Sequence, residues 1–210
     1  MIVLPVSVFV KFLRNKRTAQ LRQVKHREKK ENQIPFKYYR SAIAAITAYH
    51  RSGNKPEVFK TAKKNLLEKL AICEKPGTAV IIKNNLRAIN QYQMHFGAKH
   101  YAVKSVPKLR IAIDEIAIST KADLCATQDG ETLLIRLDMR KEGGNRSEME
   151  SLLSITAEAA KNGGLKVNPI NVLCLRTEDG DEIRGHRLRS HEREAINLAS
   201  REIATMWDSL

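Results

Sequence analysis

The first half of the chain distributes its apolar residues with the period of an α-helix. Between Tyr38 and His50 they recur three or four positions apart. A second apolar stripe begins after Pro56, and a third helical segment covers about 83–96. These spacings predict helices up to Pro107, where the pattern changes.

After Pro107 the period falls to two, which is typical of β-strands. Leu109, Ile111 and Ile113 alternate with polar or small residues. Residues 121–127 and 131–140 predict two further strands, and the Asp129-Gly130 pair between them is a strong hairpin signal.

The remainder of the second half predicts a helix, two short strands and a last helix. Ser147 and Glu150 have the spacing of a capping box at the start of the first helix, and two glycines at 163–164 end it. Residues 170–175 and 182–187 predict the strands. The sequence therefore predicts an α+β (α/β) protein, with a helical region over 1–107 and a mixed central sheet flanked by helices over 108–210.

Charge is divided unequally between these two parts. The 210 residues carry a formal net charge of +14, yet residues 1–105 hold 22 Lys/Arg against 5 Asp/Glu, while residues 106–210 hold 15 against 18. A basic field of this density attracts polyanions such as DNA or RNA, although a charge run also serves as a solvated helical face. The candidate nucleic-acid-binding residues are Arg14, Lys16, Arg17, Arg22, Lys25, Arg27, Lys29, Lys30, Lys37 and Arg40.

Other classes of protein fit the sequence less well. No apolar run reaches the ~18 residues that cross a bilayer, and three cysteines suit free thiols in a reducing cytoplasm better than a disulfide scaffold. Val6, Phe9 and Val10 beside Lys11 would suit a membrane surface, but a buried helix edge explains them better. Phosphate-cradling glycine loops, zinc-type clusters and nucleophile elbows are missing from the sequence. The sequence leaves the oligomeric state open between a monomer and a homo-oligomer.

The predicted hairpin carries the candidate chemistry. If 131–140 is a strand, Arg136, Asp138 and Arg140 share an ionic face with Leu134, while apolar residues form the opposite face. The turn brings Asp123 near, beside Arg136 or Asp138 according to the register. Two carboxylates next to a cation can hold magnesium and a phosphate. Alternatively, Asp138 pairs with Arg136 or Arg140 on an exposed strand face and Asp123 caps a turn.

These residues also carry a family resemblance. With Ala122-Asp123 on one strand and Asp138-Met139-Arg140 on the next, followed by a helix and another strand, residues 108–210 resemble the restriction-endonuclease-like PD-(D/E)XK superfamily. The resemblance implies that Asp123 and Asp138 bind Mg²⁺, with Mn²⁺ as a substitute. It places Arg140, or Arg136 in another alignment, where the family has its catalytic lysine. An arginine keeps the charge but does not release its proton near neutral pH, so any base role of that lysine would be lost.

Two functions are therefore expected from the sequence. The first is a nucleic-acid-binding protein with a divergent magnesium-dependent nuclease core, a hydrolase whose catalytic residues would be Asp123, Asp138, Arg136 and Arg140. The second is a non-catalytic nucleic-acid-binding or scaffold protein that retains the fold without cleavage. An aromatic content of 5% argues against a stacking platform for single strands, although Phe36, Tyr38 and Tyr39 lie inside the basic stretch and could stack bases or instead begin a helix core.

Overall fold

Up to Phe96, the described residues form five helices and one short strand. The computed structural model describes residues 1–16, 18–28 and 38–210. Along the first half it has β1 (Ile2–Pro5), α1 (Val6–Asn15), α2 (Ala19–Glu28), α3 (Arg40–Arg51), α4 (Pro56–Ala71) and α5 (Pro76–Phe96). Proline begins both α4 and α5, as expected for a residue whose fixed φ suits the first helical turn and whose missing N–H costs nothing there. Helix α5 consequently starts seven residues earlier than its apolar stripe predicts.

The rest of the chain, from Ala102 onwards, contains most of the strands. Its elements are β2 (Ala102–Lys104), β3 (Leu109–Ile113), β4 (Ile116–Thr120), β5 (Leu124–Gln128), β6 (Glu131–Asp138), α6 (Arg146–Asn162), the 3₁₀ turn η1 (Pro169–Asn171), β7 (Val172–Arg176), β8 (Glu182–Arg184) and α7 (Ser190–Trp207). The expected α+β class is thus confirmed, with a helical first half and mixed sheets flanked by helices.

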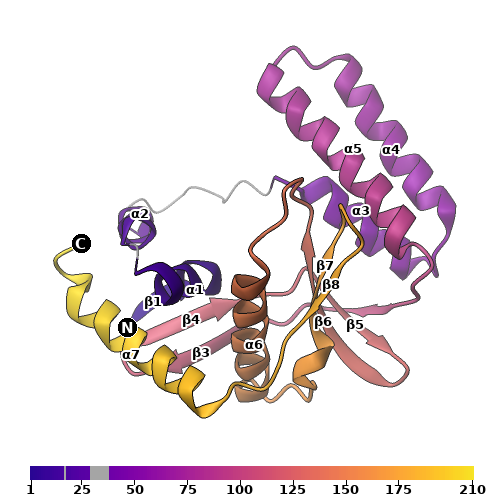
Figure 1. Ribbon diagram of the computed structural model, residues 1–210. Coiled ribbons are helices and arrows are strands. Elements are labelled where there is room, and N and C mark those ends of the chain that lie inside the picture. The colour runs from indigo at the N-terminus through magenta and orange to yellow at the C-terminus, as the bar shows by residue number, and fades with distance from the viewer. Residues whose placement is uncertain (17, 29–37) are drawn as a thin grey trace.

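The strands form two separate sheets. In the smaller sheet, ordered β1-β4-β3, β1 runs parallel to β4, and β3 is antiparallel to β4. In the larger sheet, ordered β2-β5-β6-β7-β8, only β6 and β7 are parallel, and α6 connects them. Figure 1 shows α6 between the two groups of helices, with α1, α2 and α7 on one side and α3, α4 and α5 on the other.

The larger sheet is covered on both faces. Because neighbouring strand residues point to opposite faces, Ile135 and Leu173 face α3, α4 and α5, whereas Leu134 and Cys174 face α6. The first group belongs to a helix-side core built around Phe59, whereas the second belongs to a two-sheet core that also contains α1, α7 and the smaller sheet. Each core draws residues from both sides of Pro107, so the predicted boundary marks a change of secondary structure within shared packing.

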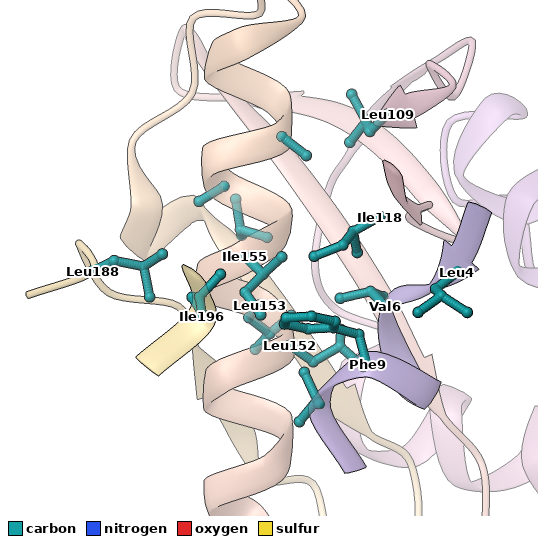
Figure 2. Close-up of a cluster of buried hydrophobic side chains, with 14 of the residues drawn as sticks. Leu4, Val6, Phe9, Leu109, Ile118, Leu152, Leu153, Ile155, Leu188 and Ile196 are labelled. Carbon is teal, nitrogen blue, oxygen red and sulfur yellow. The ribbon is translucent and has the colours of Figure 1, made fainter. Parts of the chain in front are cut away.

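Helix α1 anchors the start of the chain in the two-sheet core. Val6, Phe9 and Val10 are buried, as the predicted helix edge requires. Figure 2 shows the Phe9 ring beside Leu152 of α6. The strand β1 ahead of α1 was missed by the sequence analysis because its four residues carry no alternation long enough to detect.

Two local predictions about turns have different outcomes. The hairpin between β5 and β6 is confirmed, with Asp129 and Gly130 at φ of 50° and 80°, a left-handed turn that glycine and aspartate tolerate. The predicted capping box at Ser147 and Glu150 is wrong. Helix α6 begins earlier because the side chain of Asn145 accepts a hydrogen bond from the Glu148 N–H.

Over the described residues, no helix has the length and apolar content that crossing a lipid bilayer requires.

Candidate nucleic-acid interface

Asp123 lies at the open end of the β5–β6 hairpin. The register pairs Leu124 with Ile135, which places Asp123 opposite Arg136 and on the same sheet face as Asp138. The Asp123 N–H donates to the Ile135 carbonyl (2.8 Å), and its Oδ2 accepts from the Leu137 N–H (2.9 Å). The carboxylate therefore caps the end of the strand pair.

Asp138 ends β6 in a tight ion pair with Arg140. The Arg140 Nε donates to Oδ1 at 2.8 Å and Nη2 donates to Oδ2 at 2.7 Å, a bidentate geometry. The backbone N–H groups of Arg140 and Gly144 donate to the same two oxygens. The Asp138 side chain is only 4% exposed and the Arg140 side chain 55%, so the expected pairing joins a buried carboxylate to a half-exposed guanidinium.

The ionisation of this pair follows from its contacts. Burial alone would raise the pKa of Asp138, but the hydrogen bonds and charge of Arg140, together with the Gly144 N–H, outweigh burial and hold that pKa below its usual value. Burial also raises the pKa of the neighbouring Cys174 thiol to about 12, helped by the Asp138 charge. Cys174 is therefore protonated near neutral pH and is not a nucleophile.

The predicted ionic face of β6 is ionic only at its end. Leu134 is buried in the two-sheet core, and Arg140 lies beyond the last residue of the strand. Helix α6 covers the middle of this face. The polar side chains therefore lie at the end of β6, beyond the part that α6 covers.

Two hollows meet at this end of the sheet. The smaller, of about 300 Å³, is lined by Asp138, Arg140 and residues of α1 and α6. The larger, of about 1100 Å³, lies between the start of α3 and the strands of the smaller sheet, and Asp123 lines it. Both hollows share the residues Ser7, Tyr39, Arg136 and Leu137. We call the two together the groove.

The larger hollow is strongly basic. Among the described residues that line it, five are cationic and one, Asp123, is a carboxylate; we call the five the groove cations. Within the described part of the chain, none of the five makes a salt bridge or a side-chain hydrogen bond. They are Arg40, Lys108, Arg110, Lys121 and Arg136.

Three of the cations predicted to bind nucleic acid are instead held by the protein itself. Arg14 donates to Ser151 Oγ (2.7 Å) and the Ser147 carbonyl (3.1 Å) on α6. Lys16 pairs with Glu202 of α7, and Lys25 donates to the Asp208 carbonyl (3.0 Å) past the end of that helix. We call Arg14, Lys16 and Lys25 the docked cations because they fasten α1 and α2 to the two-sheet core.

The remaining predicted binding residues are distributed as follows. Arg22 is exposed on α2, and Arg40 lines the larger hollow. Arg17, Lys29, Lys30 and Lys37 lie outside the described residues, as does the side chain of Arg27.

Sequence reasoning missed three of the groove cations. Lys108, Arg110 and Lys121 flank or lie on strands β3 and β4, more than sixty residues after the basic run. Arg110 alternates with apolar residues and could have been recognised as an outward strand position. The proximity of all three to Arg40 depends on tertiary structure, which the charge pattern does not contain.

The arrangement at Asp138 is a poor fit for a metal ion. Both of its carboxylate oxygens already accept hydrogen bonds, and the Arg140 guanidinium occupies the side from which a cation would bind. Among the residues that the structure describes, His, Cys, Asp and Glu side chains form no group of three or more with metal-binding geometry.

A Ser–His–Glu chain elsewhere is structural. His186 Nδ1 lies 3.2 Å from Ser154 Oγ, and its Nε2 lies 3.0 Å from Glu192 Oε1. Ser154 is fully buried, and its hydroxyl donates to the Glu150 carbonyl of the same helix (2.8 Å). A substrate does not reach this hydroxyl, so the contacts serve to pack α6 against α7.

No protein-family model matches the chain, and no curated protein matches it at a significant level.

Proposed function

We propose that this protein binds nucleic acid through the sugar-phosphate backbone, in the groove at the open end of the larger sheet. The observation that carries the proposal is the excess of five groove cations over one carboxylate around a hollow of about 1100 Å³. Cations that already neutralise protein carboxylates add little to polyanion binding, whereas unpaired ones can each release a counterion from a phosphate.

The position of the groove cations supports the same proposal. Arg40, Arg110 and Arg136 lie on α3, β3 and β6, and Lys108 and Lys121 lie next to the ends of β3 and β4, so helices and strands hold the five around one hollow. Fixed cations bind a regularly spaced polyanion with less loss of side-chain entropy than mobile ones.

The test is a binding titration against salt concentration. We expect the logarithm of the affinity for short DNA and RNA fragments to fall linearly with the logarithm of salt concentration. Replacing Lys121 and Arg136 by alanine should reduce this slope by about two units and weaken binding by roughly 100-fold, about tenfold for each charge-assisted contact. The matched control replaces Lys60 and Lys64, exposed on α4 away from the groove. Equal losses in both double variants would reject the groove as the binding surface.

The second candidate function is metal-dependent cleavage of the bound nucleic acid. The favouring observation is that Asp123 and Asp138 share one sheet face at the end of a hairpin, beside Arg136, with α6 and the parallel strand β7 following as the family resemblance implies. A metal ion at Asp138 would require Arg140 to leave that carboxylate, so binding without cleavage is the better supported function.

Cleavage is tested with plasmid DNA and structured RNA in Mg²⁺ or Mn²⁺. Activity that disappears in both Asp123→Asn and Asp138→Asn, in variants that fold as judged by circular dichroism, would establish the nuclease. No cleavage by the wild type, or cleavage that survives both substitutions, would exclude catalysis at this site.

A further inference from the structure

Two aromatic rings lie among the cations of the groove. Tyr38 and Tyr39 both line the larger hollow, with ring centroids 4.9 Å apart in an edge arrangement. Tyr38 is 36% exposed, and Tyr39 also lines the smaller hollow beside Asp138. Aromatic rings next to unpaired cations are the combination with which proteins bind unpaired bases.

The backbone of this tyrosine pair is held in place by a buried side chain. Asn85 of α5 donates to the Tyr38 carbonyl (2.9 Å) and to the Ile81 carbonyl (2.8 Å), while its Oδ1 accepts from the Ala42 N–H (2.9 Å). These bonds fix the chain where it enters α3. Tyr38 is fixed further because its hydroxyl accepts a hydrogen bond from Asn84 Nδ2 (2.6 Å).

The apolar part of the lining is unusual for a surface that contacts phosphates alone. Ile43, Val106 and Pro107 line the same hollow as the groove cations, and Val106 is 39% exposed. Phosphate oxygens gain nothing from such side chains, whereas the faces of nucleobases are apolar. In a duplex those faces are stacked on neighbouring bases and do not reach rings inside a hollow.

We propose that the groove is a site for single-stranded nucleic acid, in which Tyr38 and Tyr39 stack on bases while the groove cations contact phosphates. This inference rests on the proposed nucleic-acid binding and specifies its substrate as unpaired strands. Tyr39 lines both hollows, so a base stacked on it would lie where the two meet, next to Arg136.

The experiment separates bases from phosphates. Fluorescence anisotropy compares a labelled single-stranded oligonucleotide, an abasic strand of equal length and charge, and a duplex of the same sequence. We expect the base-bearing strand to bind about tenfold or more tightly than the abasic strand, since only the former can stack on the rings. Tyr38→Leu and Tyr39→Leu should each remove about tenfold from that affinity and leave the abasic strand unaffected, whereas Tyr38→Phe and Tyr39→Phe should retain it.

Each outcome of these binding measurements either supports or overturns the single-strand site. The control is Met94→Ala, an exposed residue of α5 outside the groove, which should change nothing. Equal binding of base-bearing and abasic strands, or tighter binding of the duplex, overturns this inference and leaves backbone binding intact. Absence of binding to every strand at low salt overturns both. If Tyr39→Leu fails to fold, the more exposed Tyr38→Leu still decides between these outcomes.

Discussion

Two sets of cations in this protein have similar chemistry and different surroundings. The docked cations, Arg14, Lys16 and Lys25, lie in the densest basic run of the sequence, yet each is bonded to α6 or to the region of α7. The groove cations are scattered between residues 40 and 136 and have no protein partner within the described part of the chain. Among the described residues, the density of charge along the sequence therefore does not indicate which cations are paired; the tertiary contacts of each side chain decide that.

Arg140 is intermediate between the two sets. It lines the groove, as the groove cations do, but its guanidinium is bonded to Asp138, as the docked cations are bonded to α6 and α7. The following predictions test how far partner contacts separate the sets, starting with the change of largest expected effect.

Removing the Phe9 ring should destabilise the protein more than any change to a cation. Phe9 is fully buried in the two-sheet core, so Phe9→Ala leaves a cavity between α1 and α6 and should lower the free energy of unfolding by about 4 kcal/mol. Urea unfolding measures the change. A loss below about 1 kcal/mol would mean that the docked cations, and not apolar burial, attach α1.

Replacing Arg140 by alanine should cost about 2 kcal/mol at neutral pH, because it leaves the buried Asp138 carboxylate with only two backbone donors. It should also change how stability depends on acid. In the wild type, the lowered pKa of Asp138 stabilises the fold above the ordinary aspartate pKa of about 3.9, and this contribution is lost as the pH falls through the lowered value.

In the variant, Asp138 loses the hydrogen bonds and charge of Arg140 that oppose burial, so we expect its pKa to be higher than in the wild type. Unfolding measured from about pH 7 down to pH 3 should therefore show a smaller loss of stability on acidification in Arg140→Ala than in the wild type. Arg146→Ala, which removes an exposed arginine paired with Glu150 and Asp181, is the control. Parallel curves for Arg140→Ala and the wild type would show that Arg140 does not set the ionisation of Asp138.

The sequence predicted best those structural features that depend on residues close together along the chain. The period of apolar residues predicted helices α3, α4 and α5 and strand β3, and Asp129-Gly130 predicted the turn that places Asp123 opposite Arg136. Strand β4 was missed because Ile116, Ala117 and Ile118 are all buried, so its sequence shows no alternation of apolar and polar residues.

The residues of the candidate site could be predicted only in part, because some of them come together through tertiary packing alone. Asp123 and Asp138 belong to one hairpin, so strand geometry alone placed them on the same sheet face, and Arg140 follows two residues after Asp138. Lys108 and Lys121 reach the groove only because the smaller sheet packs beside the start of α3. No local pattern encodes that approach, which depends on how the two sheets are arranged around α6.

Removing all three docked cations at once should affect stability and not binding. The triple alanine variant at Arg14, Lys16 and Lys25 loses exposed hydrogen bonds and pairs worth about 0.5 kcal/mol each, so about 1.5 kcal/mol in total. The matched triple at Lys108, Arg110 and Lys121 removes the same charge from exposed positions and should change stability by no more than about 0.5 kcal/mol while weakening nucleic-acid binding strongly. If both triples weaken binding equally, net charge alone determines affinity.

Gly144→Ala should have the smallest effect on stability. It should also weaken the contact of Arg140 with Asp138 and so make Arg140 more like the groove cations. A Cβ at this position would lie 2.2 Å from Arg140 Nη2, so the flexible guanidinium must shift away from the carboxylate of Asp138 while every charge is retained. We expect a loss of about 1 kcal/mol in urea unfolding, with an acid response shifted in the same direction as in Arg140→Ala. The control is Gly77→Ala in the first turn of α5, where a Cβ meets no atom within 4 Å and alanine should be neutral or slightly stabilising. Unchanged stability in Gly144→Ala would mean that Arg140 leaves Asp138 at little cost, and then the carboxylate is as accessible to a ligand as the groove cations are.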